Sequence, residues 1–343
     1  MGFCVMVTDH AWRSLDIERR VLGAIGAELI IAQTGEESEL VQLAPRADAI
    51  LTNRKPITPT VLDAARSCRV VACYGFEVDN VAVQHATCLG ILVTNVPHNC
   101  TEEVSDHTMG LLLMCARSIA KLSSSTRRGK WDLDAGQPLQ RLRGKTLGIL
   151  GFGNVAKALI PKALSFGLEI IAYTPHIPYG KMTNFGTLTN NLKFVLSESD
   201  FVSIHMSLNA ETRGLINSRA LRLMKPSAYL INTSHGAIID ETDLYQALKR
   251  GWIAGVALDV LGIEPPNPDN PLLRMENVIV TPHAAFCSDE VIEELERNAA
   301  TQVAQVLCNQ VPPNVVNPEV TRQASFRLEI EVTGVFESRV HVS

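Results

Sequence analysis

The chain lacks the long apolar runs and the excess of basic residues that mark membrane-spanning and nucleic-acid-binding proteins. No apolar run approaches the ~18 residues that a bilayer-spanning helix requires. The formal net charge is −5, which gives no support to binding of nucleic acid or of an anionic membrane through bulk charge. We therefore expect neither kind of partner.

Paired cysteines are lacking as well. Eight cysteines occur singly, without a Cys-x-x-Cys pair, so we expect reduced cysteines in the core and no metal site. The N-terminal residues lack a basic segment and a cleavage site, which favours a first strand over a signal peptide. The expected location is the cytoplasm.

At 343 residues the chain exceeds one ordinary hydrophobic core, so two domains are expected. Apolar runs alternate with helical patterns, which predicts an α/β fold with parallel sheets covered on both faces. The expected strands outside the central region are 3–8, 29–32, 49–52, 70–73, 91–96, 201–206, 228–233, 253–260 and 278–281.

Two long helices are expected. The first spans 101–122 and begins at Thr101, with Glu102 and Glu103 favourably placed in its first turn. Its central part is apolar nearly all round, which indicates a buried helix, and 125–145 is expected to be a connecting loop. The second spans 289–309 and is long enough to cross back onto the first domain.

A short apolar run at 147–150 predicts a parallel strand that is buried on both faces. After it, Gly151 permits a sharp turn, and Gly153 lets the backbone approach a pyrophosphate at the start of a helix near Asn154. A second strand is expected at 169–173. Because strand, turn and helix follow in this order within about thirty residues, we predict a dinucleotide-binding crevice.

Further motifs lie in order along the chain from about residue 45 to 318. They are Val78-Asp79-Asn80-Val81, Thr94-Asn95-Val96-Pro97, Cys100-Thr101-Glu102-Glu103-Val104-Ser105-Asp106-His107, Met224-Lys225-Pro226, Ile231-Asn232-Thr233-Ser234, Ala257-Leu258-Asp259-Val260, Glu264-Pro265 and Thr281-Pro282-His283-Ala284-Ala285-Phe286. With the glycine loop, this set resembles the D-2-hydroxyacid dehydrogenase family, and most closely its branch related to the C-terminal binding protein.

The resemblance implies an NAD(P)-dependent oxidoreductase that acts on a small molecule and forms a homodimer. It implies a Rossmann-type doubly wound domain at 101–284, which binds NAD or NADP, and a flavodoxin-like substrate domain formed by 1–100 and 285–318. The tail at 319–343 has an alternating pattern typical of a hairpin, and its role stays open.

The chemistry that the resemblance implies is hydride transfer between C4 of the nicotinamide and the carbinol carbon of a 2-hydroxy acid. A histidine exchanges the proton of the substrate oxygen, and this histidine maps to His283. A carboxylate that maps to Glu264 binds the imidazole and fixes its tautomer. The alternative is a vestigial pair without a catalytic role.

Two ligand-facing positions depart from the family pattern. The arginine that clamps the carboxylate and carbonyl is His235 here, and Glu77 replaces a glycine in the substrate-binding segment, which comprises Tyr74, Gly75, Phe76 and Glu77. One charge at ~4 Å is worth ~4 kcal/mol at an effective dielectric of ~20, so both changes oppose an anionic 2-oxo acid.

We therefore expect a substrate that is neutral, or cationic at the end nearest Glu77, with His235 beside the carbonyl. A left-handed backbone at Glu77 would add strain of ~1–2 kcal/mol. The alternative is that Glu77 turns into solvent and His235 only fills space.

The third departure concerns the cofactor. Thr174 stands where the family has an aspartate that binds the ribose, which admits NADP as well as NAD. We expect His205 and Ser207 to line the adenine and ribose side, and Asp259 to face the nicotinamide amide. The expected cofactor-binding residues are Gly151, Phe152, Gly153, Asn154, Val155, Tyr173, Thr174, Pro175, His176, His205, Ser207, Thr212, Thr233, Ser234 and Asp259.

Two functions stay open from the sequence. One is an NAD(P)-dependent oxidoreductase that acts on a C=O or CH–OH group of a non-standard substrate. The other is a catalytically impaired NAD(P)-binding scaffold or a corepressor-like sensor. The presence of both Glu264 and His283 favours the enzyme.

Overall fold

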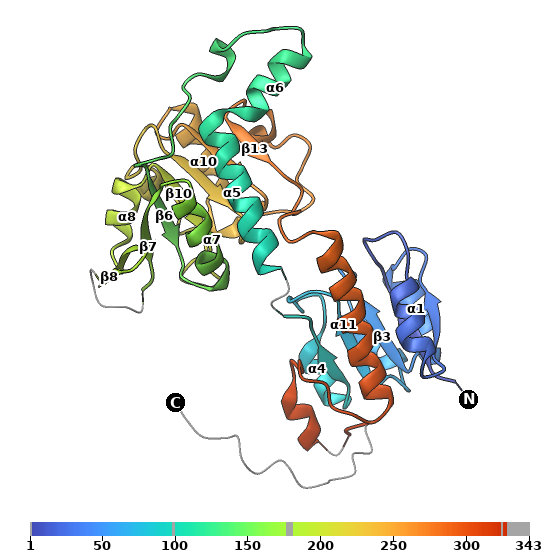
Figure 1. The fold of residues 1–343 in the computed structure, drawn as a ribbon. Helices are drawn as coiled ribbons and strands as arrows, with labels where there is room; N and C mark the ends of the chain where they lie inside the picture. Colours follow the sequence, from blue (N-terminus) through green and yellow to red (C-terminus); the bar gives the residue numbers. More distant parts are fainter. Residues whose placement is uncertain (1, 98–99, 176–180, 324, 328–343) are drawn as a thin grey trace. The chain divides into compact units, whose positions relative to one another are not determined.

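The computed structural model describes residues 2–97, 100–175, 181–323 and 325–327, and the chain divides into two compact units (Figure 1). The first unit comprises Met1–Asn99 and Ser288–Ser343, and the second unit comprises Cys100–Cys287. Each is built on a mainly parallel sheet with helices packed against it, so the predicted α/β class is confirmed.

The described strands of the first unit are all parallel and have the order β2-β1-β3-β4-β5. This is the strand order of flavodoxin-like sheets, as predicted. All residues of β3 and β4 are buried, because helices cover both faces of the sheet. The strands are β1 Cys4–Val7, β2 Glu28–Ile31, β3 Ala49–Thr52, β4 Val70–Cys73 and β5 Leu92–Thr94.

Helix α11 is the longest helix of the first unit, and it packs against α1, β3 and β4 (Figure 1, orange-red beside blue). It begins where the hydroxyl of Ser288 accepts a hydrogen bond from Val291 N, and its buried side includes Leu295, Ala299 and Val303. The helices are α1 Asp16–Gly23, α2 Glu37–Leu43, α3 Pro59–Ala64, α4 Val83–Cys88 and α11 Asp289–Leu307, with short 3₁₀ turns η1 Ala44–Arg46 and η5 Pro318–Arg322.

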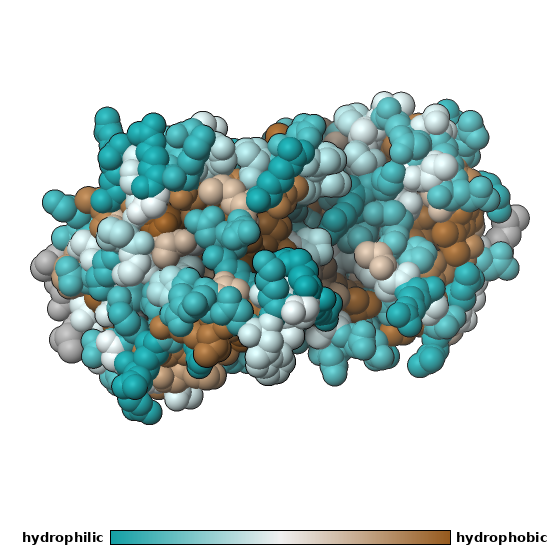
Figure 2. Space-filling view, turned by 90° about the horizontal axis from the view of Figure 1, so that it is seen from above, coloured by the Kyte–Doolittle hydropathy of each residue, from teal (hydrophilic) through white to brown (hydrophobic). Residues whose placement is uncertain are grey.

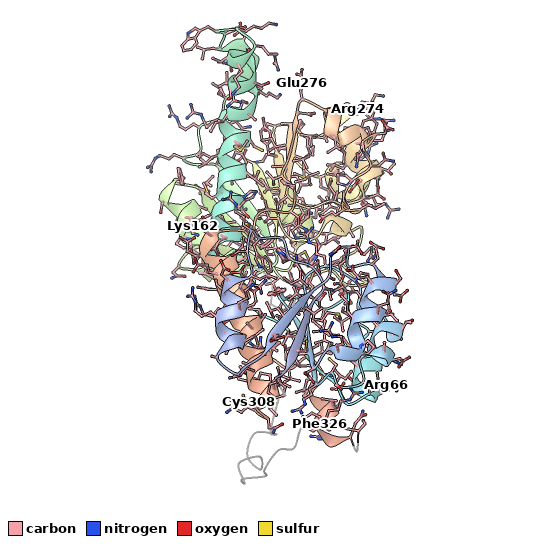
Figure 3. The ribbon with its side chains drawn as sticks, turned by 90° about the vertical axis from the view of Figure 1, so that its right-hand side faces the viewer. Arg66, Lys162, Arg274, Glu276, Cys308 and Phe326 are labelled. Carbon is pink, nitrogen blue, oxygen red and sulfur yellow. The ribbon has the colours of Figure 1, made fainter. Side chains whose placement is uncertain are left out.

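The segment after α11 is fastened to the edge strand β5. Asn317 is fully buried, its Oδ1 accepts from Val93 N, and its Nδ2 donates to Ile91 O. Beyond η5, the guanidinium of Arg327 donates to the carbonyl of Leu89 after α4 and to those of Ala65 and Arg66 after α3; Arg66 is labelled in Figure 3. The hairpin expected in the tail falls mainly on 328–343, which lie outside the described residues.

The sheet of the second unit has the order β13-β12-β11-β10-β6-β7-β9-β8. Its strands are parallel except for the β8–β9 hairpin at the edge, which the sequence patterns did not predict. The strand order reverses between β6 and β10, which is the switch point where doubly wound sheets bind ligands. The strands are β6 Thr146–Leu150, β7 Glu169–Tyr173, β8 Lys181–Thr183, β9 Gly186–Thr189, β10 Phe201–Ile204, β11 Tyr229–Asn232, β12 Gly255–Leu258 and β13 Val278–Val280.

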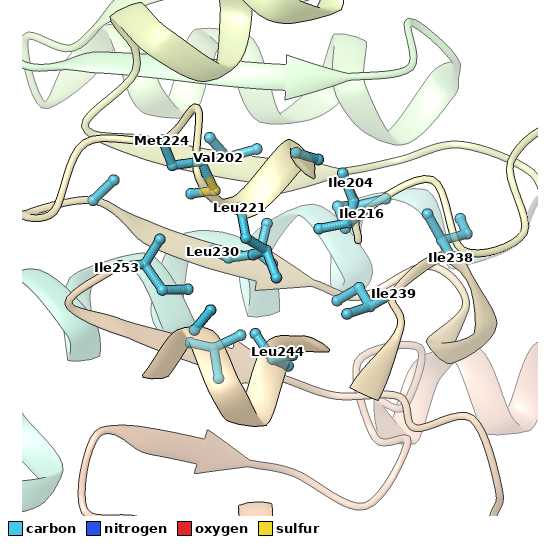
Figure 4. Packing of buried hydrophobic residues seen from close by; sticks show 14 of the residues in the cluster. Val202, Ile204, Ile216, Leu221, Met224, Leu230, Ile238, Ile239, Leu244 and Ile253 are labelled. Carbon is cyan, nitrogen blue, oxygen red and sulfur yellow. The ribbon is translucent and has the colours of Figure 1, made fainter. Parts of the chain in front are cut away.

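Helices cover both faces of this sheet. Because side chains alternate along a strand, Leu230 of β11 joins the core that includes Leu244 and Ile253 (Figure 4), whereas Ile231 packs on the face of α5 and α7. The helices are α5 Thr101–Arg117, α6 Ile119–Arg127, α7 Asn154–Ser165, α8 Leu192–Glu198, α9 Ser218–Leu221 and α10 Glu241–Lys249, with 3₁₀ turns η2 Asp134–Gly136, η3 Gly236–Ile238 and η4 Pro271–Arg274.

The prediction of one continuous helix at 101–122 was wrong. Ser118 has a left-handed backbone, with φ of 48°, and it divides α5 from α6. The expected loop at 125–145 is also shorter, because α6 continues to Arg127 and η2 follows. A serine in this conformation has no distinctive sequence signal, and the apolar pattern continues across it.

The surface seen from above Figure 1 carries hydrophobic as well as hydrophilic side chains (Figure 2). In the second unit, Ile119, Trp131 and Leu133 are exposed to 49%, 93% and 71%. None of the helices in the described residues is long and apolar enough to span a membrane. No group of three His, Cys, Asp or Glu side chains in the same residues could hold a metal ion.

Candidate functional site

The loops that follow β11, β12 and β13 carry the three residues for which we expect a catalytic role. His235 follows β11, Glu264 follows β12, and His283 follows β13. Because these neighbouring strands are parallel, their carboxyl ends meet at one edge of the sheet. The site therefore lies at the edge where doubly wound sheets bind their ligands.

His283 and Glu264 form a close pair. His283 Nδ1 lies 2.6 Å from Glu264 Oε2, while Oε1 of the same carboxylate accepts a hydrogen bond from Leu261 N at 2.9 Å. A carboxylate only accepts, so Nδ1 carries the proton and Nε2 of the neutral ring is left as an acceptor. The two side chains remain 42% and 31% exposed, which leaves the imidazole accessible to a ligand.

The backbone of His283 has a left-handed conformation, with φ of 53°. Such a conformation is costly for a residue other than glycine and persists only where neighbouring groups enforce it. Here Asp259 enforces it: its carbonyl accepts from His283 N, and its carboxylate accepts from Ala284 N and Ala285 N, both at 2.9 Å. Asp259 is thus the anchor of the His283 loop.

The side chain of Asp259 is only 1% exposed and also accepts from Thr281 Oγ1 at 2.5 Å. A contact between this carboxylate and a nicotinamide amide stays a prediction. His107 of α5 completes the network, since its Nε2 lies 3.0 Å from Thr281 Oγ1 and 3.5 Å from Asp259 Oδ1. His107 lies within one of the sequence motifs, but the motif alone assigns it no role.

The His235 loop is shaped by its neighbours. Asn232 Oδ1 accepts from Ser234 N at 3.0 Å, and Asn232 Nδ2 donates to His235 O at 2.9 Å. At Gly236 a Cβ atom would lie 2.0 Å from the carbonyl carbon of Leu261, so only glycine fits there. This contact packs the His235 loop against the segment that leads to Glu264, and the half-buried His235 lies at the same edge of the sheet as the His283–Glu264 pair.

The glycine turn has the features that a pyrophosphate requires. Gly151 has φ of 98°, and a Cβ there would lie 2.4 Å from the carbonyl oxygen of His205. At Gly153 a Cβ would meet no atom within 4 Å, and no side chain caps the helix that starts at Asn154. Open space in front of uncapped backbone N–H groups suits a phosphate, so these residues fit a dinucleotide.

Phe152 and Val155 flank the turn. The ring of Phe152 stacks on that of Phe185 at 5.4 Å and has Lys157 Nζ 5.6 Å from its centre. Val155 is partly buried in the first turn of α7. The Phe152 ring is therefore held beside the turn by Phe185 and Lys157.

The expected ribose end lies beyond β7. Tyr173 and Thr174 are half-buried, Thr174 N donates to Thr189 O at 2.9 Å, and Pro175 is exposed. His176 lies outside the described residues. His205 follows β10 with Nε2 2.8 Å from Ser203 Oγ, and desolvation lowers the pKa of its imidazole to about 4. His205 is therefore neutral near pH 7 and offers no positive charge to a phosphate.

Three further residues predicted to bind the cofactor shape loops. The hydroxyl of Thr212 donates to Ser207 O at 2.7 Å and is nearly buried, whereas Ser207 itself is exposed. Thr233 Oγ1 lies 2.8 Å from Thr108 Oγ1 of α5, which ties the loop after β11 to this helix. Ser207 is the one of these three side chains that remains open to a ligand.

In the first unit, the 74–77 segment follows β4. The Tyr74 side chain is 0% exposed and its hydroxyl donates to Glu18 Oε1 at 2.9 Å, so a contact of Tyr74 with the substrate, which stays a prediction, would be made by its backbone. Phe76 is 63% exposed and Glu77 is exposed too. The expected strain at Glu77 is absent, since φ at this residue is not positive.

The chain matches the family model described as D-isomer specific 2-hydroxyacid dehydrogenase, NAD binding domain, at residues 109–285. It is 40% identical over 271 residues to a glyoxylate reductase of Korarchaeum cryptofilum. The matched region covers 78% of this chain and 81% of the relative. A solved protein of Thermus thermophilus has a TM-score of 0.82 at 32% identity, over 92% of this chain and 100% of that one. An NADPH-dependent glyoxylate/hydroxypyruvate reductase of Sinorhizobium meliloti, solved with NADP and malonate, has a TM-score of 0.78 at 25% identity, over 96% and 98%.

Alanine substitutions at the two glycines of the turn should affect different properties, NADH binding at Gly153 and thermal stability at Gly151. Gly153→Ala should leave the melting temperature unchanged, because its Cβ meets no protein atom, but should weaken NADH binding at least tenfold where the pyrophosphate approaches. Gly151→Ala should lower the melting temperature, because of its positive φ and the clash with His205. Thermal unfolding and calorimetric titration with NADH measure both effects. Unimpaired NADH binding by Gly153→Ala would contradict the placement of the pyrophosphate.

Proposed function

The chain belongs to the D-isomer specific 2-hydroxyacid dehydrogenase family and is therefore an NAD(P)-dependent oxidoreductase that acts on a C=O or CH–OH group, and we propose that His283 and Glu264 carry its proton transfer. The observation that carries this proposal is the 2.6 Å contact between His283 Nδ1 and Glu264 Oε2, with Nε2 left for the substrate. General acid–base catalysis requires such an oriented imidazole.

In the reductive direction, a bound NAD(P)H supplies the hydride. His283 in its protonated form donates from Nε2 to the substrate oxygen as the carbinol forms. Glu264 stabilises the imidazolium through Nδ1 and keeps the ring in one orientation. Asp259 holds the backbone from which His283 projects, so it acts on the reaction by positioning.

The same proposal places the cofactor at the carboxyl ends of β6, β7 and β10. The pyrophosphate would lie on the amides at Gly153 and Asn154, and the adenosine ribose near Thr174 and His205. Thr174 has no charge to repel a 2′-phosphate, and neutral His205 has none to attract it. These residues therefore admit both NAD and NADP.

We further propose that the substrate is a small 2-oxo compound whose acid group is not held by an arginine. A relative that is 40% identical is a glyoxylate reductase, which supports the small size. The imidazole of His235 cannot form the bidentate charged hydrogen bonds that a guanidinium forms with a carboxylate, and the carboxylate of Glu77 repels an anion. A neutral or cationic 2-oxo compound should therefore compete better here than in relatives that have the arginine.

A homodimer in the cytoplasm is the third part of the proposal. Exposed apolar side chains gather on α6 and the segment after it, at Ile119, Trp131 and Leu133 (green, at the end of α5 in Figure 1). Large apolar side chains that are exposed on neighbouring segments are a feature of surfaces that bind other proteins. Because the family resemblance implies a homodimer, a second copy of the chain is the partner that we propose for this surface.

The first prediction concerns His283. His283→Ala should lower kcat for reduction by NADH or NADPH ~10²–10⁴-fold, because the substrate oxygen loses its proton donor. Steady-state kinetics with glyoxylate, glyoxylamide and 2-oxo-5-guanidinovalerate measure the effect. His85→Ala, which removes a partly exposed histidine from the first unit, is the matched control and should keep full activity. An unchanged kcat in His283→Ala would refute the assignment.

A second prediction concerns the choice of substrate. His235→Arg should lower KM for glyoxylate ~10–100-fold, because a charged hydrogen bond adds roughly 1.5–3 kcal/mol. The KM for glyoxylamide, which has the same size and no charge, should change far less. The ratio of kcat/KM for the two compounds is the measurement, and Arg219→Lys is a surface control. An unchanged ratio would show that residue 235 does not contact the acid group.

The proposed dimer can be tested by measuring the mass of the protein in solution, which should fall when the interface is disrupted. The wild-type chain should sediment as a dimer at micromolar concentration, and Trp131→Glu should raise the dissociation constant at least tenfold by placing a charge in the apolar interface. Val311→Glu introduces the same charge at a partly exposed apolar residue of the first unit and should have no effect. A wild-type monomer in analytical ultracentrifugation would refute the dimer.

A further inference from the structure

A histidine outside the proposed catalytic pair lies behind the anchor of the His283 loop. His107 stands in the second turn of α5, and its side chain is 26% exposed. Its Nε2 lies 3.0 Å from Thr281 Oγ1 and 3.5 Å from Asp259 Oδ1. The proposed proton transfer does not use this imidazole.

The hydrogen bonds between these groups run in one direction. A carboxylate only accepts, so the hydroxyl of Thr281 gives its single proton to Asp259 Oδ1 at 2.5 Å. The oxygen of this hydroxyl then accepts, and the donor that faces it is Nε2 of His107. His107 therefore carries a proton on Nε2, and a chain of donors runs from α5 through Thr281 to Asp259.

This chain ends on the backbone beside His283. The carboxylate of Asp259 accepts from Ala284 N and Ala285 N, both at 2.9 Å. The oxygen that receives the Thr281 hydroxyl, Oδ1, is also the one that receives Ala284 N, the amide directly after His283. The hydroxyl of Thr281 therefore helps to fix the direction of Oδ1, and with it the left-handed turn at His283.

His107 strengthens this arrangement. Each donor in a chain of hydrogen bonds polarises the next, so the N–H of His107 makes the hydroxyl of Thr281 a stronger donor. Asp259 is 1% exposed, so little water competes for its oxygens. Among the residues that the structure describes, His107 is also the basic side chain that lies against this buried carboxylate. The imidazole thus supports an acid that otherwise relies on neutral donors.

The part of α5 that carries His107 is held on two sides. One residue further along, Thr108 Oγ1 lies 2.8 Å from Thr233 Oγ1 in the loop after β11. One residue before, Asp106 Oδ1 lies 2.6 Å from Lys162 Nζ of α7. Because both contacts fix the helix next to His107, the imidazole has a defined place from which to orient its partner.

We propose that His107 is a positioning residue for His283. It donates to the hydroxyl of Thr281 and thereby holds the carboxylate of Asp259 against the amides that follow His283. This inference rests on the proposed function in so far as His283 is the proton donor. Loss of the N–H at residue 107 lets the turn at His283 relax, so that the ring meets Glu264 less often.

The kinetic test compares substitutions that keep or remove the donor. The probe is whichever of glyoxylate and glyoxylamide the wild type reduces faster with NADH. His107→Leu has no N–H and should lower kcat about tenfold, since small displacements of a catalytic group cost up to ~10²-fold. His107→Gln keeps an N–H close to the place of Nε2 and should retain most of the wild-type kcat. The dissociation constant of NADH should change far less than kcat, because the glycine turn takes no part in the chain.

His85→Leu is the matched control, since it makes the same substitution at a partly exposed histidine of the first unit and should leave kcat unchanged. A wild-type kcat in His107→Leu would overturn the inference. An equal loss in His107→Leu and His107→Gln would overturn it too, because the donor would then not be what matters.

A double-mutant cycle tests the route through the threonine. Thr281→Val keeps the shape of the side chain without the hydroxyl and should lower kcat at least as much as His107→Leu. Thr281→Ser keeps the hydroxyl and should retain most of the activity. In the Thr281→Val background, His107→Leu should lower kcat no further. A full additional loss in that background would show that the route through Thr281 is wrong.

Two measurements need no turnover. The Nδ1 proton between His283 and Glu264 gives a downfield proton NMR signal, which His283→Ala identifies by its loss. This signal should weaken in His107→Leu and persist in His107→Gln. The amides of Ala284 and Ala285 should exchange several-fold faster in His107→Leu than in the wild type. A residue that only stabilised α5 would lower the melting temperature and leave both readouts unchanged, which would overturn the inference.

These readouts separate the inference from the proposed function. If the NMR signal and the exchange rates change as expected while the wild type reduces neither probe, the proposed function fails and the coupling of His107 to the His283 loop holds. If the wild type is active and His283→Ala is not, but His107→Leu changes none of the readouts, the proposed function stands and the inference fails.

Discussion

The buried carboxylate of Asp259 is the interaction on which the proposed catalytic edge depends. It accepts hydrogen bonds from two successive backbone amides and one hydroxyl, and thereby holds the left-handed turn at His283. Without these acceptors the turn would relax, since a residue with a β-carbon disfavours it. The carboxylate of Glu264 then only has to orient a ring whose backbone is already fixed. Asp259 thus fixes the backbone of His283, and Glu264 orients its side chain.

The sequence predicted the parts of the fold whose signals are local. The strands at 49–52 and 70–73 were located to the residue, because strands buried on both faces are continuous apolar runs. The glycine turn was predicted for the same reason, since positive φ at Gly151 requires that residue type. The pairing of His283 with Glu264 came instead from the family resemblance.

Other features could not be read from the sequence because they depend on contacts between distant residues. The break at Ser118 is a backbone choice that many residues could make, and the β8–β9 hairpin is too short to have a clear pattern. Tyr74 belongs to the segment expected to bind the substrate, and no local pattern predicts that its hydroxyl donates to Glu18, fifty-six residues earlier in the chain. Burial of a polar side chain is decided by such distant partners.

The close contact at Gly236 has a consequence for how this site can change. The course of the loop is set by the side chain of Asn232 and by the fit of Gly236 against Leu261, so main-chain contacts on both sides of residue 235 define where it sits. The backbone on both sides of residue 235 therefore keeps its course whichever side chain residue 235 carries. A change between arginine and histidine at this position can alter the preference for a substrate while the rest of the loop stays in place.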